Sequence, residues 1–194
     1  MPPPTTTTRP VPPAATWGLL AAFVLHDLEE LWTMAEWRNR RSEELRTHYP
    51  WLPERATALL RTDQEHMATA IGLMGLITAA AAADGARTGG RSGFYQWMLT
   101  GFGLHAGSHL ALSAAWRGYT PGVVTAPLVV APFSAWALRT LHRHGVLRPM
   151  TVGDTVRSVA MAPALIVGVH AAASGIVRAR RALRSRRAAG RRTR

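Results

Sequence analysis

Apolar residues occur in this chain as long uninterrupted runs, not as the narrow stripes of a water-soluble helix. Residues 67–83, 92–116, 118–138 and 158–177 contain no Asp, Glu, Arg or Lys. A helix needs about 20 mainly apolar residues to cross a bilayer, and each run is close to that length. The runs therefore predict four membrane-spanning helices.

A fifth apolar segment precedes these runs and carries acidic residues in its second half. It has no Asp, Glu or Arg between residues 10 and 26, and it then reads His26-Asp27-Leu28-Glu29-Glu30. Charged side chains are costly inside a membrane and face the interior of a helix bundle. The sequence thus predicts an all-α fold, a polytopic membrane helix bundle of about five transmembrane helices, at residues 15–36, 65–83, 93–116, 119–138 and 158–177.

Prolines and two polar tails subdivide this arrangement. Pro121, Pro127 and Pro132 fall in the fourth predicted helix, which should be kinked or partly broken. Residues 1–14 are rich in Pro and Thr and are expected to form a disordered tail. Residues 178–194 contain nine arginines and are expected to form a cytoplasmic tail after the membrane domain, which comprises residues 15–177.

The distribution of arginine predicts the orientation of the helices. With five spans and an outer N-terminus, the inner side holds 16 of the 23 arginines and the outer side holds seven. Cytoplasmic loops of membrane proteins carry the excess of Arg and Lys. The chain is therefore expected to be a multi-pass plasma-membrane protein with its N-terminus outside and its C-terminus in the cytoplasm.

Composition and charge exclude several classes of chemistry. The chain has no cysteine and no lysine, which excludes disulfides, thiolate ligands and covalent catalysis by lysine. The net charge of +12 would suit a nucleic-acid-binding protein, but the arginines gather next to apolar helices. Anionic lipid is the simpler partner for such clusters. Membrane lipid is thus an expected partner, and nucleic acid is not.

Histidines and carboxylates recur at helical spacing on two of the predicted spans. His26, Glu29 and Glu30 stand at positions i, i+3 and i+4, so they share one side of the first helix. His105 and His109 are four residues apart and share one side of the third helix. In the expected orientation both groups lie in the inner half of the bundle, where they are expected to converge.

This set of side chains is one that binds divalent metals inside helix bundles. His26, Glu29, Glu30, His105 and His109 are the candidate ligands, for zinc, iron or manganese. His26, Glu29 and Glu30 are also the candidate catalytic groups. Without a metal, two adjacent carboxyl groups in a dry pocket do not both ionise easily, and a protonated Glu beside His26 would form an acid–base pair.

Several of these polar residues have alternative, structural interpretations. His105 and His109 would serve equally as hydrogen-bonding groups that hold two helices together. Asp27 is a candidate for orienting the imidazole of His26. Glu65 and His66 begin the second predicted helix and are expected at the membrane surface.

Two blocks of the sequence resemble the HXXEE domain family. The first is His26-Asp27-Leu28-Glu29-Glu30, and the second is His109 followed ten residues later by Tyr119-Thr120-Pro121-Gly122-Val123-Val124-Thr125. The resemblance covers about residues 17–140 and implies a small integral membrane protein of uncharacterised function. The family pattern therefore applies to His26, Glu29, Glu30, His109 and residues 119–125 of this chain. Many members of that family have Asn where this chain has His105. The resemblance therefore leaves His105 as either a metal ligand or a polar neighbour of the site.

The expected function is that of a membrane-embedded enzyme acting on a lipid-like or isoprenoid substrate through the buried His/Glu site. With a metal the reaction would be hydrolysis or oxidation, and without one it would be acid–base cyclisation. Tyr119 and Thr125 would bind a polar end of this hydrophobic small molecule. The alternatives are a proton-coupled transporter or carrier, which at this size would need to form a homo-oligomer, and a non-catalytic membrane subunit.

Overall fold

The computed structural model describes residues 10–51, 53–54, 63–149 and 151–192, and the regular structure of this part of the chain is all helical. The all-α class is therefore confirmed. Residues 1–9 of the expected disordered tail lie outside the described residues. The elements are α1 (Pro13–His48), α3 (Gln64–Arg87), α4 (Gly93–Trp116), η1 (Ala126–Val130), α5 (Ala131–Arg143) and α6 (Val152–Arg192).

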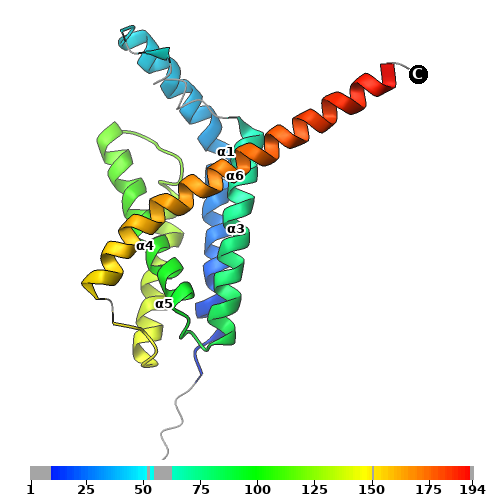
Figure 1. Cartoon of the computed structure of the whole chain (residues 1–194). Coiled ribbons are helices and arrows are strands. Elements are labelled where there is room, and N and C mark those ends of the chain that lie inside the picture. The colour runs from blue at the N-terminus through cyan, green and yellow to red at the C-terminus, as the bar shows by residue number, and fades with distance from the viewer. Residues whose placement is uncertain (1–9, 52, 55–62, 150, 193–194) are drawn as a thin grey trace, which may run out of the picture.

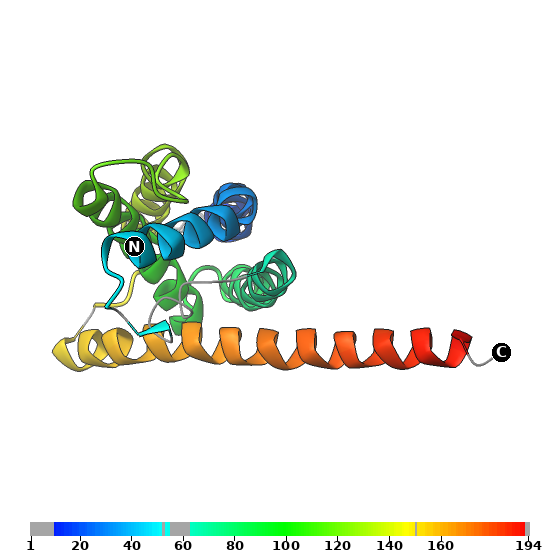
Figure 2. The ribbon, with the colours of Figure 1, turned by 90° about the horizontal axis from the view of Figure 1, so that it is seen from above.

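Four helices form a bundle, and the last helix crosses it. α1, α3, α4 and α5 run alongside one another, whereas α6 passes obliquely over the outside of the bundle (Figure 1). Seen from above, α6 extends lengthwise along one side, where it packs on α3 and α4 (Figure 2). The predicted span at 158–177 thus belongs to a helix that crosses the other four instead of running parallel to them.

The interior of the bundle is tightly filled, and its outside carries large apolar side chains. The main core cluster surrounds the fully buried Tyr95 and draws on α1, α4, η1 and α5. Outside this core, the side chains of Trp32, Leu76, Leu104 and Leu128 are 74, 70, 71 and 71% exposed. These four residues come from α1, α3, α4 and η1. The exterior is therefore apolar on several sides of the bundle.

The first and last helices are longer than the spans expected for them. α1 continues to His48 rather than ending near residue 36, and α6 continues to Arg192, so most of the tail at 178–194 is helical. Arg, Ala, Leu and Glu are good helix formers, and ion pairs three residues apart add to the stability of the α1 extension. Among the described residues, α3 and the Ala160–Ala188 segment of α6 are long and apolar enough to cross a membrane.

Residues 119–125 form a turn and not the start of the fourth predicted helix. Regular structure begins at Ala126, with the π-helix η1 that passes directly into α5. Pro121 has no N–H to donate, and Gly122 has a φ of 82°, which lies in the left-handed region. In a regular helix the ring of Pro132 would meet the carbonyl four residues earlier, and the wider π turn relieves that contact.

Polar contacts hold α6 against the first turn of α3. The amide of His66 donates to the Asp63 carboxylate at 2.8 Å, which caps α3 and lowers the pKa of Asp63. Arg181 pairs with Asp63 at 3.1 Å and with Glu65 at 3.3 Å. His66 Nε2 lies 2.9 Å from His170 Nδ1. Glu65 and His66 thus bind α6 as well as starting α3.

Candidate metal centre

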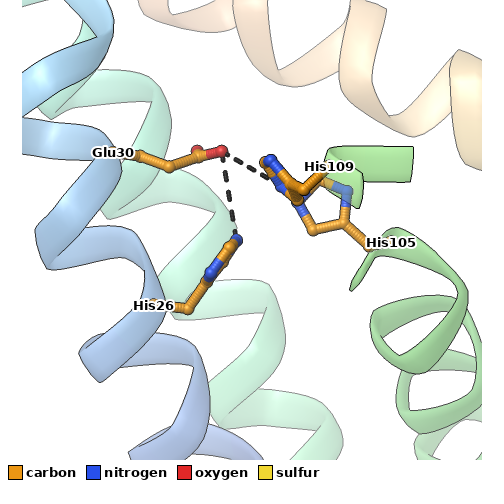
Figure 3. Close-up of side chains that lie close together, drawn as sticks. All are labelled: His26, Glu30, His105 and His109. Carbon is orange, nitrogen blue, oxygen red and sulfur yellow. Dashed lines mark hydrogen bonds and ion pairs between the residues drawn. The ribbon is translucent and has the colours of Figure 1, made fainter. Parts of the chain in front are cut away.

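Four side chains from two helices converge inside the bundle. His26 and Glu30 extend from α1 toward His105 and His109 of α4 (Figure 3). One ligand atom from each residue lies within 4.8 Å of the other three. The spacing of four residues puts each pair on one face of its helix, and the two faces meet. The structure thus brings together four of the five candidate ligands.

The distances between these atoms suit the coordination of one metal ion. His109 Nε2 lies 2.8 Å from His105 Nε2 and 3.4 Å from Glu30 Oε1, and His26 Nε2 lies 3.9 Å from the same oxygen. A tetrahedral zinc ion with bonds of about 2.0–2.1 Å keeps its ligand atoms about 3.3 Å apart. The separations, which reach up to 4.8 Å, fall on both sides of that value, so the side chains would have to move to bind an ion, and His105, whose Nε2 donates to His109 Nε2, would have to carry its proton on Nδ1 instead.

Hydrogen bonds determine which nitrogen is free in two of the rings. His109 Nδ1 lies 2.8 Å from the Pro121 carbonyl, which only accepts, so Nδ1 carries the proton. His26 Nδ1 lies 2.8 Å from Thr125 Oγ1. The Thr125 hydroxyl has one proton, which it donates to Glu29 at 2.6 Å, so its oxygen accepts from His26 and His26 Nδ1 carries the proton. In both rings Nε2 is left with a lone pair, the form in which histidine binds metals.

His26 Nε2 is the atom that a metal would satisfy. The atom is buried and has no hydrogen-bond partner among the described residues, and His26 as a whole is only 1% exposed. A buried polar atom without a partner costs about 1–3 kcal/mol and is rare in proteins. Because its lone pair faces Glu30, His105 and His109, a cation bound among them would remove that cost.

Glu29, the fifth candidate ligand, is engaged elsewhere. Its Oε2 accepts from the Thr125 amide at 2.8 Å, and its Oε1 accepts from the Tyr119 hydroxyl at 2.9 Å and from the Val124 amide at 3.3 Å. Neighbouring residues on a helix point about 100° apart, so Glu30 faces the cluster while Glu29 faces residues 119–125. Tyr119 and Thr125, expected at the substrate, both bind Glu29.

Residues 119–125 therefore form a support loop for the two oriented histidines. Besides the Pro121 carbonyl and the Thr125 hydroxyl, the loop contributes Gly122, which packs directly on the imidazoles. A Cβ at Gly122 would lie 2.5 Å from His109 Cε1 and 2.8 Å from His26 Cε1. No larger residue fits against the two rings without moving them.

Sequence reasoning missed the contributions of Pro121 and Gly122. The signal lay in the Pro-Gly pair itself, between Thr120 and Thr125 in an otherwise apolar run. A Pro-Gly pair is typical of a turn. Asp27 was the residue expected to orient His26, but Thr125 holds the Nδ1 atom of that ring. Asp27 is itself buried, at 8% exposure.

Thr125→Val tests whether the support loop raises the affinity of the candidate centre for a metal ion. The substitution keeps the shape of the side chain but removes the hydroxyl between His26 and Glu29, so His26 loses its orienting partner. We expect metal affinity to fall by about 10–100-fold, as it does when outer partners of ligating histidines are removed. Competition with a chelating dye measures the affinity. The control is Thr140→Val, because within the described part of the chain the Thr140 hydroxyl bonds the Trp136 carbonyl one turn away in α5 and no residue of the cluster. Equal affinities of Thr125→Val and the wild type would contradict this role.

Comparison with known proteins identifies a family whose match includes the clustered side chains. The family model described as "Protein of unknown function with HXXEE motif" matches residues 17–137, which include all four clustered side chains and the support loop. No curated protein and no solved structure matches the chain. In the motif itself, the histidine and the second glutamate face the cluster and the first glutamate anchors the loop. Since the matched residues make up more than half of its length, the chain belongs to the HXXEE family.

Proposed function

We propose that this chain is a membrane-embedded enzyme that uses one divalent metal ion, zinc in the first place, to hydrolyse a lipid-like substrate. The observation that carries the proposal is the buried, unpartnered Nε2 of His26, which faces Glu30, His105 and His109. Imidazoles with a carboxylate are a donor set that suits zinc, iron or manganese. A metal held there would polarise an ester oxygen and make a water molecule acidic enough to lose a proton near neutral pH.

Each residue of the cluster has its own part in this proposal. His26, His105 and His109 would hold the ion, with Glu30 beside them as a base and not as a fourth ligand, and the support loop keeps the rings of His26 and His109 oriented. Glu30, whose Oε1 lies 3.4 Å and 3.9 Å from the Nε2 atoms of His109 and His26, would accept the proton of the attacking water and return it to the leaving alcohol. The Glu30 side chain is 12% exposed, which limits exchange with bulk water.

The surface of the bundle supports a location within a membrane. Large apolar side chains that are at least 70% exposed project from α1, α3, α4 and η1. α3 and the Ala160–Ala188 segment of α6 have the length and composition of membrane spans. Fifteen of the 23 arginines lie between residues 38 and 61 or after residue 177. We extend the proposal to a multi-pass plasma-membrane protein with an outer N-terminus and with the arginine-rich ends of α1 and α6 in the cytoplasm.

In this orientation the centre lies near the cytoplasmic ends of the helices. The side chain of Gln64, the first residue of α3, donates to the Leu31 carbonyl of α1. Glu30 is therefore close to the level at which α3 begins. A substrate embedded in the inner leaflet would reach the centre with the part of its chain nearest the head group.

Glu30→Gln separates metal binding from catalysis. Purified in a neutral detergent, the wild type is expected to carry about one equivalent of metal. The variant keeps the three imidazoles and should retain most of the metal, whereas hydrolysis of lipid esters should fall by at least about 100-fold because the proton acceptor is lost. Elemental analysis and turnover of a panel of lipid esters measure the two quantities.

Glu43→Gln is the matched control, because Glu43 lies on the same helix and its exposed ion pair with Arg46 is outside the cluster. It should change neither metal content nor turnover. A wild-type chain with less than about 0.1 equivalents of metal, even after incubation with zinc, would refute the proposal. Equal turnover in Glu30→Gln and the wild type would refute the role of Glu30.

A further inference from the structure

A cavity of about 220 Å³ opens further along α1, on the proposed cytoplasmic side of the metal centre. It is lined by Trp37, Arg40, Arg41, Glu44 and Tyr119. Pockets that enclose a whole drug-sized ligand measure about 300–1,000 Å³. This cavity is therefore of a size to hold one end of a larger molecule.

Arg41 is held in the orientation of an anion-binding residue. Its guanidinium group lies 5.6 Å from the ring centre of Trp37 and 4.9 Å from that of Trp116. The two indoles meet edge to face, with ring centres 6.0 Å apart. Stacking occupies the faces of a guanidinium and leaves the N–H groups at its edge, one of which donates to Glu44. The guanidinium of Arg41 thus borders the cavity between two indoles and Glu44, and its other N–H groups are the donors that a ligand there would meet.

Arg40 supplies a second positive charge that a ligand can recruit. It pairs with Glu36 at 3.7 Å, and the two side chains are 66 and 73% exposed. Exposed ion pairs of this kind are weak and exchange readily. Two arginines that line one cavity favour a ligand with several anionic oxygens, which is a property of phosphate.

The cavity and the metal centre share one face of α1 and the support loop. Trp37 and Arg41 follow Glu30 by seven and 11 residues, so all three lie on the same side of the helix, with Trp37 about 10 Å and Arg41 about 17 Å beyond Glu30. Tyr119 connects the two sites: Trp37 Nε1 donates to its carbonyl at 3.0 Å, and its hydroxyl donates to Glu29. A molecule in the cavity thus touches the loop that orients the histidines.

We propose that this cavity binds the phosphate head group of a membrane amphiphile and so selects the substrate of the metal centre. The inference rests on the proposed function and narrows it to phosphate-bearing amphiphiles whose labile bond lies about 10–17 Å from the phosphate. The tryptophan pair beside the arginines matches this assignment, because Trp favours the head-group level of a membrane. The adjacent apolar exterior would receive the hydrocarbon chain.

Binding of dodecyl phosphate to the zinc-loaded full-length chain in neutral detergent tests the head-group site. Native mass spectrometry measures the bound fraction, with dodecylphosphocholine as the ligand that has the same chain but no net charge. We expect dodecyl phosphate to bind at least about 10-fold more tightly than dodecylphosphocholine. Arg40→Gln combined with Arg41→Gln should reduce its affinity at least about 10-fold, and Arg40→Gln alone, which removes only an exposed pair, should reduce it about 3-fold or more.

Arg46→Gln is the matched control, since Arg46 is on the same helix outside the cavity and pairs with Glu43. It should leave affinity within about 2-fold of the wild type. Equal binding of the two dodecyl ligands, or unchanged binding in both Arg40 variants, would refute the head-group site. Inorganic phosphate that competes as strongly as dodecyl phosphate would assign the cavity to free phosphate and refute the amphiphile. Metal content is measured on the same samples. A chain that binds no metal but still binds dodecyl phosphate through the arginines would refute the proposed metal enzyme and support the head-group site on its own.

Discussion

Replacement of His109 by Ala is expected to lower bound metal from about one equivalent to less than about 0.1. Of the four clustered side chains, His109 has the most contacts within the site. Its Nε2 lies beside His105 Nε2 and Glu30 Oε1, and its Nδ1 donates to the Pro121 carbonyl. Removing the ring deletes one ligand, frees His105 to rotate and leaves a loop carbonyl without its donor. The expected loss of affinity exceeds the 10–100-fold that removal of an outer partner causes.

Elemental analysis and competition with a chelator of known affinity measure the effect of His109→Ala. His142→Ala is the control, because His142 lies in the last turn of α5 and outside the cluster. It should bind as much metal as the wild type, while circular dichroism should show the same helix content in all three proteins. A folded His109→Ala protein that carries a full equivalent of metal would mean that the ion binds elsewhere in the chain.

Gly122→Ala is expected to lower metal affinity by at least about 100-fold, although it changes no ligand and adds no charge. The new Cβ would lie 2.5 Å from His109 Cε1, 2.7 Å from His109 Nδ1 and 2.8 Å from His26 Cε1. Either the rings move away from the cluster, or the support loop withdraws and breaks the bonds from Pro121 and Thr125. Overpacking of this kind costs about 1–3 kcal/mol in addition to the backbone strain of a side chain at positive φ.

Gly145→Ala separates the steric effect from the backbone effect. Gly145 also has a positive φ, of 65°, but a Cβ there would meet nothing within 4 Å. This control should lose stability in thermal unfolding yet bind metal as the wild type does. If Gly122→Ala and Gly145→Ala bind metal equally well, the support loop does not set the positions of the two histidines.

Helix positions and the His/Glu pairs were accessible from sequence because both depend on short-range regularities. The length of an uncharged run indicates a helix, and a spacing of four residues puts two side chains on one face. The difference between Glu29 and Glu30 was not accessible in this way. Because Glu29 and Glu30 are adjacent, nearly the same sequence surrounds both. Only the docking of Tyr119, Val124 and Thr125 against α1 decides which carboxylate anchors the loop.

The direction of α6 and the course of the fourth segment were also beyond sequence reasoning. Run length determines how far a helix extends but not the angle at which it packs. That angle depends on contacts between distant residues, such as those of His170 with His66 and of Arg181 with Asp63. In the fourth segment three prolines indicated a break, yet the turn geometry arises from the positive φ of Gly122 and its fit against two rings.

The oblique course of α6 also keeps the carboxyl-terminal helix apart from the clustered side chains. Every clustered ligand atom and every described contact that orients it comes from α1, α4 or the support loop. The family match likewise ends at residue 137, before α6 begins. Substitutions in the carboxyl-terminal helix, away from its contacts with α3 and α4, are therefore expected to leave the four clustered side chains in place.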